Sequence, residues 1–197
     1  SQAVIGKDTK REYKFEDEKI AATATLADPA AIPDNAEFKV TPITDQKAIA
    51  AYLEALNNKN TDVTYSKDNT LFYDFAFLID KVDANGNAIA GEKVEIEPAK
   101  GAVQLNVVFK KAQLTDGIGA TANNVVVNHI SLKDSVKNSV DKAIDATNIS
   151  ASDVVVESVN AQVSASADQD TATLTLSSLS EITFTTAPTP GTSMDVI

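Results

Sequence analysis

The sequence predicts an all-β protein, an antiparallel β-sandwich with one or two short helices. Apolar and polar residues alternate with a period of two in several stretches, which is typical of strands with one buried face. Turn-forming residues separate these stretches, and helical spacing recurs in only two places. With 197 residues, of which 43% are hydrophobic, the chain can bury a core without a metal or a disulfide.

Four stretches carry the alternation. Their apolar residues stand at every second position, and the residues between them are mainly Thr, Gln, Asn, Lys and Glu. A β-branched Thr suits the pleated surface of a strand while its hydroxyl stays in water. The stretches that we predict as strands with one buried face are residues 20–26, 94–96, 103–109 and 172–176.

The longest apolar stretch, residues 71–82, is predicted to be a central strand that is covered on both faces. Asp74 interrupts it. A buried carboxylate needs a partner or a shifted pKa, so we expect a salt bridge or a turn anchor there, with a functional site as the alternative. The predicted faces carry Tyr73, Phe75, Phe77 and Ile79 on one side and Phe72, Ala76 and Leu78 on the other.

Two helices are predicted. Asp45 can cap the first, which carries an apolar stripe and is expected to end at Asn57-Asn58. The second is predicted over residues 133–146 from the i, i+4 recurrence of apolar residues. The stripes are Ile49, Tyr52, Leu53 and Leu56 in the first helix, and Val136, Val140 and Ile144 in the second.

The chain is predicted to hold one module, residues 12–186. A flexible segment, residues 1–11, precedes it, and residues 187–197 read as a linker or tail because they are rich in Pro, Gly, Ser and Thr. A split into two sub-domains near residues 111–124 is the alternative, because that stretch contains glycines and reads as a long connection.

Charge and composition exclude several classes of function. The net charge of −11 and the presence of a single arginine, Arg11, argue against nucleic acid as a partner. The absence of Cys excludes disulfides, thiolate catalysis and Cys-ligated zinc. No apolar run approaches the roughly 18 residues of a membrane-spanning helix, so direct membrane insertion is not expected.

The residues that could carry catalysis are few, so we predict that the protein is not an enzyme and holds no cofactor. His129 is the only histidine, and a catalytic role would require a serine nucleophile and an orienting carboxylate beside it. No nucleophile elbow, phosphate-binding loop or zinc-protease motif is present. Glu95 and Glu97 share the polar face of their strand, where solvated carboxylates make poor general acids.

A calcium loop is one candidate site. Asp83, Asn85 and Asn87 have the i, i+2, i+4 spacing that opens an EF-hand loop. The pattern then fails, because Ala88 and Val94 stand where the loop needs Gly and Glu. A hairpin turn around Asn85-Gly86 explains the same residues.

The order of several short patterns resembles a known family. The patterns run from Ala31-Ile-Pro-Asp-Asn-Ala-Glu-Phe-Lys-Val-Thr-Pro-Ile43 and Ala51-Tyr-Leu-Glu-Ala-Leu56 to Asp68-Asn-Thr-Leu-Phe-Tyr-Asp-Phe-Ala-Phe77. They continue with Glu97-Pro-Ala-Lys-Gly-Ala-Val-Gln-Leu-Asn-Val-Val-Phe109, Val127-Asn-His-Ile130 and Ser177-Ser-Leu-Ser-Glu-Ile-Thr-Phe184. Over residues 12–186 the chain resembles the immunoglobulin-like β-sandwich repeat modules of large wall-anchored surface proteins of Gram-positive gut bacteria.

This resemblance implies a non-enzymatic extracellular module at the bacterial cell surface, acting as an adhesin stalk, spacer or adhesion domain. The alternative is a carbohydrate- or protein-binding module appended to a secreted enzyme. The expected partners are a host or matrix protein, a glycan, or neighbouring modules of the same chain, and the isolated module is expected to be a monomer.

The family also suggests an intramolecular Lys–Asn isopeptide bond. The candidates are Lys14, Lys39 and Asn106. Each stands at a position of the alternating pattern that faces solvent, where groups keep their ordinary charge states. A thioester bond to a host surface is excluded because it requires Cys.

Overall fold

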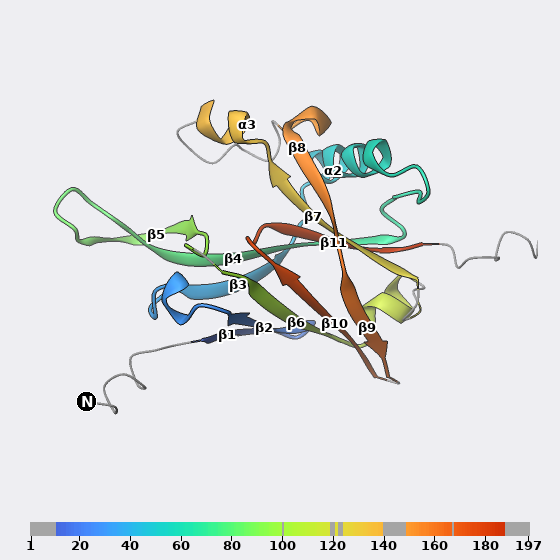
Figure 1. Cartoon of the computed structure of the whole chain (residues 1–197), viewed down its shortest axis with the longest axis horizontal. Helices are drawn as coiled ribbons and strands as arrows, with labels where there is room; N and C mark the ends of the chain where they lie inside the picture. Colours follow the sequence, from blue (N-terminus) through green and yellow to red (C-terminus); the bar gives the residue numbers. More distant parts are fainter. Residues whose placement is uncertain are drawn as a thin grey trace, which may run out of the picture.

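Two antiparallel β-sheets packed face to face form the body of the protein (Figure 1). The computed structural model describes residues 11–99, 101–118, 121, 124–139, 149–166 and 168–187. Every strand pairing in both sheets is antiparallel. The predicted fold class, an all-β antiparallel sandwich with one or two short helices, is confirmed.

Sheet A has five strands in the order β1-β2-β6-β10-β9. Sheet B has six, in the order β3-β4-β11-β7-β8, with β5 paired to the outer half of β4. The strands of sheet A are β1 (Glu12–Glu16), β2 (Ile20–Leu26), β6 (Val103–Lys110), β9 (Ala161–Ala165) and β10 (Gln169–Leu176). Those of sheet B are β3 (Glu37–Pro42), β4 (Thr70–Val82), β5 (Ala88–Ile96), β7 (Val125–Leu132), β8 (Val154–Val159) and β11 (Glu181–Thr186).

Helices connect or cover the strands. In the part of the chain that the structure describes, the α-helices are α2 (Gln46–Lys59) and α3 (Asp134–Ser139). Short 3-10 helices are η1 (Pro29–Ala31) and η4 (Ala151–Asp153), and η2 (Gln113–Gly117) is a short π-helix. Each sheet contains strands from both sides of residues 111–124 in the sequence. In sheet A, β6 lies between β2 and β10, and in sheet B, β4 pairs with β11.

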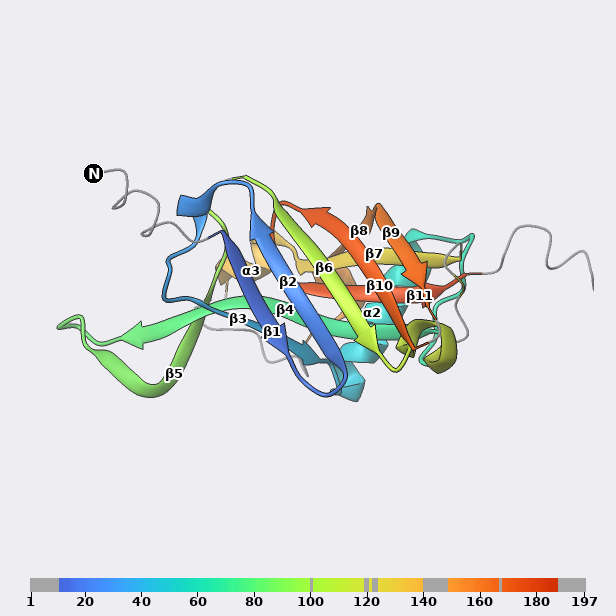
Figure 2. The ribbon, with the colours of Figure 1, turned by 90° about the horizontal axis from the view of Figure 1, so that it is seen from below.

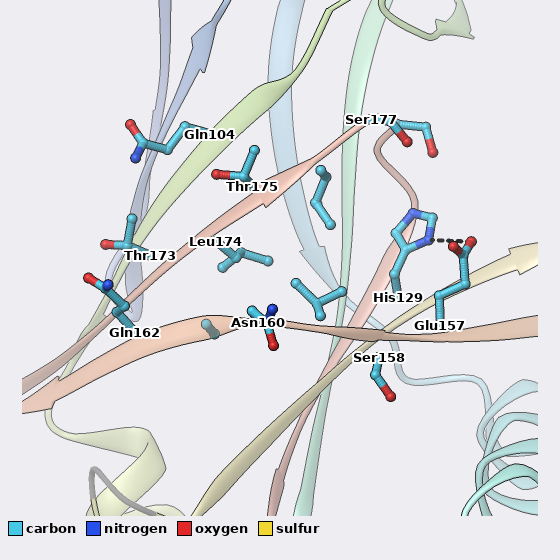
Figure 3. Close-up of a pocket in the computed structure, with 14 residues that line it drawn as sticks. Gln104, His129, Glu157, Ser158, Asn160, Gln162, Thr173, Leu174, Thr175 and Ser177 are labelled. Atoms are coloured by element: carbon cyan, nitrogen blue, oxygen red, sulfur yellow. Dashed lines mark ion pairs between the residues drawn. The ribbon is translucent and has the colours of Figure 1, made fainter.

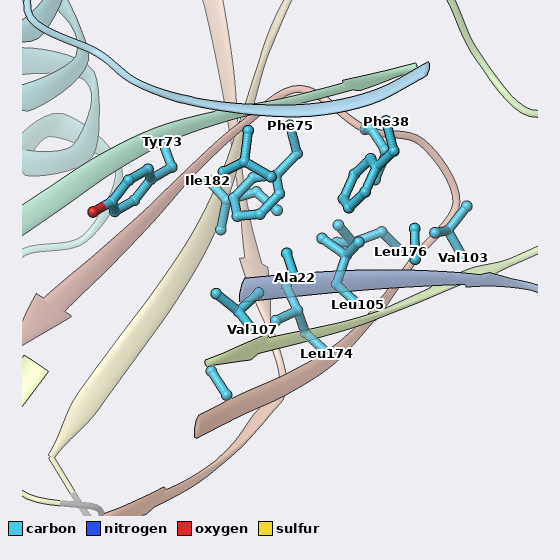
Figure 4. Close-up of a cluster of buried hydrophobic side chains, with 14 of the residues drawn as sticks. Ala22, Phe38, Tyr73, Phe75, Val103, Leu105, Val107, Leu174, Leu176 and Ile182 are labelled. Carbon is cyan, nitrogen blue, oxygen red and sulfur yellow. The ribbon is translucent and has the colours of Figure 1, made fainter. Parts of the chain in front are cut away.

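The main core lies between the sheets and is built by the period-two alternation. In β2, β6 and β10 the predicted apolar positions are buried, and the Thr, Gln and Asn residues between them point outward. Each large side chain that leaves water in this way contributes about 1.5–3 kcal/mol. Figure 4 shows part of this cluster, including Phe38, Phe75, Val103, Leu105, Leu174 and Ile182.

Strand β4 is buried on both faces, as predicted. Tyr73, Phe75 and Phe77 enter the core between the sheets, whereas Phe72 belongs to a second cluster beneath α2. Aromatic contacts tie the first group to neighbouring strands, and the ring of Phe77 lies 5.2 Å from that of Tyr13 in edge-to-face geometry.

Helix α2 covers the outer face of sheet B. Asp45 caps it as predicted, since its Oδ1 accepts a hydrogen bond of 2.8 Å from the backbone N–H of Ala48. The helix runs on to Lys59, past the predicted end at Asn57-Asn58. Asn57 instead pairs its side chain with the backbone of Tyr65, which fixes the following loop against the helix.

Strand β5 corrects one prediction. Residues 94–96 do form a strand, but Val94 is 37% exposed and does not enter the core. The β4–β5 hairpin extends past the end of the sandwich, so its outer part has no opposing sheet (Figure 2). Cross-strand ion pairs, Lys93–Asp80 at 2.6 Å and Lys81–Glu92 at 3.7 Å, line it instead.

Some predictions fall partly or wholly on residues that the structure does not describe. The flexible segment 1–11 is described only at residue 11, and the tail 187–197 only at residue 187. The second predicted helix is present as α3, and its predicted continuation, which includes Val140 and Ile144, lies outside the described residues.

A buried carboxylate anchors the turn that follows β6. Lys111 and Ala112 adopt positive φ angles of 65° and 49°, which are costly for residues other than Gly. Asp170 on β10 is fully buried, and its Oδ2 accepts a hydrogen bond of 3.2 Å from the N–H of Leu114. This bond helps hold the chain in the turn conformation.

Replacing Asp170 should therefore destabilise the fold. Asp170→Ala should lower the free energy of unfolding by about 2 kcal/mol, because the buried N–H of Leu114 loses its hydrogen-bond acceptor. Urea unfolding followed by circular dichroism measures this change. The matched control is Asp168→Ala, at an exposed position just before the same strand, which should stay within about 0.5 kcal/mol of the parent. Equal effects of the two substitutions would refute the assigned anchor.

Candidate functional site

A cleft opens where the chain crosses from sheet B to sheet A. Strand β8 ends at Val159, β9 begins at Ala161, and Asn160 alone connects them. The pairing of β9 with β10 stops at Leu174, so the end of β10 runs past its neighbour. The resulting β8–β9 cleft has a volume of about 600 Å³, within the usual range for small-ligand sites.

The lining of the β8–β9 cleft is mainly polar. Figure 3 shows His129 and Glu157 on one side of β10, and Gln104, Thr173 and Gln162 on the other. Apolar side chains are few, and the lining contains no Lys or Arg. The lining residues with polar side chains are Gln104, His129, Glu157, Ser158, Asn160, Gln162, Thr173, Thr175, Ser177 and Ser178.

His129 has the two kinds of neighbour that a catalytic histidine needs. Its Nε2 lies 2.9 Å from Ser180 Oγ, and its Nδ1 lies 3.9 Å from Glu157 Oε1. The Ser180 hydroxyl, however, donates its single hydrogen to the carbonyl of Ile130. Nε2 is therefore the donor toward Ser180, which is the reverse of the arrangement in which histidine removes a proton from a nucleophile.

The outer face of sheet A continues from the cleft. Antiparallel partners point to the same side of a sheet, so the register places the polar residues of four strands on one surface. Asn106 and Thr173 are joined across this surface by a hydrogen bond of 3.0 Å. The outer face of sheet A comprises Ala21, Thr23, Thr25, Gln104, Asn106, Val108, Gln162, Ser164, Thr171, Thr173 and Thr175, together with the charged residues Glu12, Lys14 and Glu16 of the edge strand β1.

Asp74 lies on the opposite face of sheet B from His129. It pairs in register with Glu181, and Glu181 pairs with Ile130, whose side chain packs beneath α2. Burial raises the pKa of Asp74. Burial also raises the pKa of Tyr52 on α2, and the carboxylates of Glu181, Asp74 and Asp45 add to that increase. His129 and Asp74 therefore do not share a site.

The calcium candidates form a hairpin turn. Oδ1 of Asp83 accepts hydrogen bonds from the backbone N–H groups of Asn85 and Asn87 at 2.9 and 3.0 Å. Gly86 supplies the positive φ, 84°, that the turn requires. Within the described residues, no group of three or more His, Asp or Glu side chains is placed to hold a metal ion.

The remaining candidates are exposed. The three candidates for an isopeptide bond, Lys14, Lys39 and Asn106, are exposed, as the alternation of polar and apolar residues predicted. The side-chain amide of Asn106 donates a hydrogen bond to Thr173. Glu95 and Glu97 are exposed too, and Glu97 accepts a hydrogen bond of 2.8 Å from the N–H of Leu179.

Sequence reasoning did not identify the cleft or the partners of His129. Ser180 is 51 positions away from His129, and only the pairing of β11 with β7 brings them together. Glu157 arrives through the pairing of β8 with β7. The sequence showed that the Thr, Gln and Asn residues occupy polar positions of their strands. That these positions form one surface depends on the order of the strands in the sheet.

Comparison with known proteins identifies no relative. No family model, curated protein or solved structure matches the chain. Within the described residues, no helix has the length and apolar character needed to cross a membrane.

The buried Asp74 should make stability depend on pH. The pKa of Asp74 is higher in the folded than in the unfolded chain. The ionisation of Asp74 therefore does not oppose folding below about pH 4, where the side chain is protonated in both states. As pH rises through the pKa of the folded state, this stability is lost. Asp74→Asn should therefore be more stable than the parent at pH 7, and the difference should disappear on acidification.

Thermal unfolding of both proteins across this pH range measures the effect. Asp62→Asn, at an exposed position, is the control and should follow the parent curve. A constant offset between Asp74→Asn and the parent at every pH would contradict the titration of Asp74.

Proposed function

We propose that this chain is a non-enzymatic extracellular module of a bacterial cell-surface protein and acts as an adhesin stalk or spacer. The observation that carries the proposal is the position of the two ends of the described chain. The chain enters the fold at β1, on the side of the sandwich from which the β4–β5 hairpin projects, and leaves on the opposite side after β11 (Figures 1 and 2). A module of this shape separates whatever is attached to its two ends.

The first strand is held by side chains as well as by its neighbour. The backbone N–H of Leu26 donates to the carbonyl of Arg11, and the Arg11 guanidinium donates to the carbonyl of Leu26. The Tyr13 hydroxyl lies 2.8 Å from the carbonyl oxygen of Pro33 and 3.1 Å from that of Ile32. A pull on this end therefore acts on the strand pairing and on contacts with a separate loop.

The last strand is held more firmly, because β11 lies inside sheet B between β4 and β7. Its end is fixed by further contacts. The Thr186 hydroxyl donates to the carbonyl of Ile118 at 2.8 Å, and its N–H donates to the carbonyl of Asn69 at 2.8 Å. Strand β1 has one neighbouring strand and β11 has two, so tension should release β1 first.

Two further observations support the proposal. The His129–Ser180 contact has the wrong donor for nucleophilic catalysis, which favours a role without chemistry. The resemblance of residues 12–186 to modules of wall-anchored surface proteins favours the extracellular location.

Single-molecule pulling through the two ends tests the spacer role. The protein should resist force, and Tyr13→Phe should lower the unfolding force because it removes both hydrogen bonds to residues 32 and 33 while keeping the buried ring. Tyr52→Phe is the matched control, since it removes a tyrosine hydroxyl from helix α2, which packs on the outer face of sheet B and away from β1. If the control weakens the protein as much as Tyr13→Phe, or if the parent unfolds without measurable resistance, the spacer role is refuted.

The cellular location has its own test. Antibodies raised against this chain should label intact cells of the producing bacterium without permeabilisation. Brief treatment of those cells with an external protease should remove the label. Labelling that requires permeabilisation would contradict the extracellular assignment and leave the mechanical measurement unaffected.

A further inference from the structure

The open edges of the two sheets differ in how they are protected. Edge strands commonly carry charged residues or proline, which discourage pairing with another chain. Strands β1, β3 and β5 follow this pattern, since each has two or more charged residues. Strand β9 has none, but it is only five residues long, and a short edge is itself a protection. Strand β8 begins with three consecutive valines and carries a single charge, at Glu157.

The backbone of β8 is available along this edge. Within the described residues, β8 pairs with β7 alone. The N–H of Lys133 donates to the carbonyl of Asp153 at 2.9 Å, so these two residues face each other as a hydrogen-bonded pair. Such pairs alternate with non-hydrogen-bonded ones, and the register of β7 with β8 is continuous. The N–H and C=O groups of Val156 and Ser158 therefore point away from β7, where they can bind an extended backbone.

A groove lies between helix α2 and the start of β8, which are neighbours in Figure 1. Its volume is about 630 Å³. Val154 and Val156 of β8 belong to the same buried cluster as Ala55 of α2, so the floor of the groove is apolar. A strand added to β8 would direct every second side chain to this side of the sheet. The groove therefore favours a peptide with apolar residues at alternate positions.

Charge narrows the class of peptide further. Within the described residues, three charged side chains line the groove: Lys59 and Lys133 are positive, and Glu54 is negative. The carboxylate of Asp153, next to the groove, accepts hydrogen bonds of 2.9 Å from both the N–H and the hydroxyl of Ser150. The chain as a whole has 28 acidic and 17 basic residues, so this lining departs from the overall balance. The two lysines complement carboxylates on a ligand.

We propose that the open edge of β8 binds an extended peptide segment of a partner protein, in which apolar residues alternate with acidic ones. The peptide pairs with Val156 and Ser158 as an added strand. Its apolar side chains enter the groove beside α2, and its carboxylates interact with Lys59 and Lys133. This role is additional to that of the spacer and does not depend on it.

Nuclear magnetic resonance titration tests the proposal. The probes are two pools of six-residue peptides, in which Val, Ile or Ala alternates with Glu or Thr in the acidic pool and with Lys or Thr in the basic pool. The acidic pool should shift the backbone amide signals of Val156 and Ser158, because these N–H groups gain hydrogen bonds. The basic pool should bind about tenfold more weakly, because its charges face Lys59 and Lys133.

A proline variant makes the test specific to the edge. Ser158 is exposed and its N–H does not pair with β7, so Ser158→Pro removes a donor from the open edge and leaves the β7–β8 ladder intact. The acidic pool should bind this variant at least about tenfold more weakly, because an added strand loses a hydrogen bond and meets the proline ring. Ser158→Thr keeps the N–H and is the matched control, which should bind like the parent. Circular dichroism checks that both variants fold.

A second variant leaves the backbone unchanged and decides the matter if the proline variant does not fold. Lys59→Gln/Lys133→Gln, at two exposed positions, should bind the acidic pool about fivefold more weakly. The control is Lys39→Gln, at an exposed position on β3 at the opposite edge of sheet B, and it should bind like the parent.

Several outcomes would overturn the proposal. They are an absence of shifts at β8 with the acidic pool, shifts that map to another edge, undiminished binding by folded Ser158→Pro or by the double lysine variant, and equal binding of the two pools. If the signals of Val156 and Ser158 move when the protein alone is concentrated, β8 pairs with a second copy and the peptide assignment fails. None of these outcomes bears on the pulling experiment.

Discussion

Burial of β4 on both faces is the constraint on which the rest of this structure depends. One face supplies Tyr73, Phe75 and Phe77 to the core between the sheets, and the other supplies Phe72 to the cluster beneath α2. A strand that is apolar on both sides needs a layer on each side. Sheet A and α2 are those layers, and the polar loop that follows α2 is tied back through Asn57 so that the helix stays in place.

The same constraint leaves the two outer surfaces unequal. Sheet B uses its outer face to bury α2, and the cost appears at Asp74, a carboxylate kept partly out of water beside Glu181. Sheet A has no such obligation, so its outward positions can carry Thr, Asn and Gln without any penalty for burial. The polar surface and the cleft beside it thus lie on the side of the molecule that stability leaves unconstrained.

The sequence predicted those parts of the fold that depend on local pattern. Alternation identified β2, β6 and β10, and Asp45 marked the start of α2, because these signals come from neighbouring residues. The prediction that Val94 is buried was wrong. Alternation shows that a strand has one polar and one apolar face, but it does not show that another sheet covers the apolar face. The cleft was not predictable, since it depends on the crossing at Asn160 and on where the β9–β10 register ends. The partners of His129 were missed for a related reason: strand pairing brings them in from distant parts of the chain.

The position of β11 also bears on how the protein is made. It is the last of the described strands, yet it lies inside sheet B between β4 and β7. A chain synthesised from its N-terminus has residues 70–74 of β4 waiting without their partner until residues 181–186 emerge. The pairing of these two strands in sheet B therefore cannot form until residues 181–186 have been synthesised. Until those residues emerge, one edge of β4 presents unpaired backbone N–H and C=O groups, which can pair with other chains.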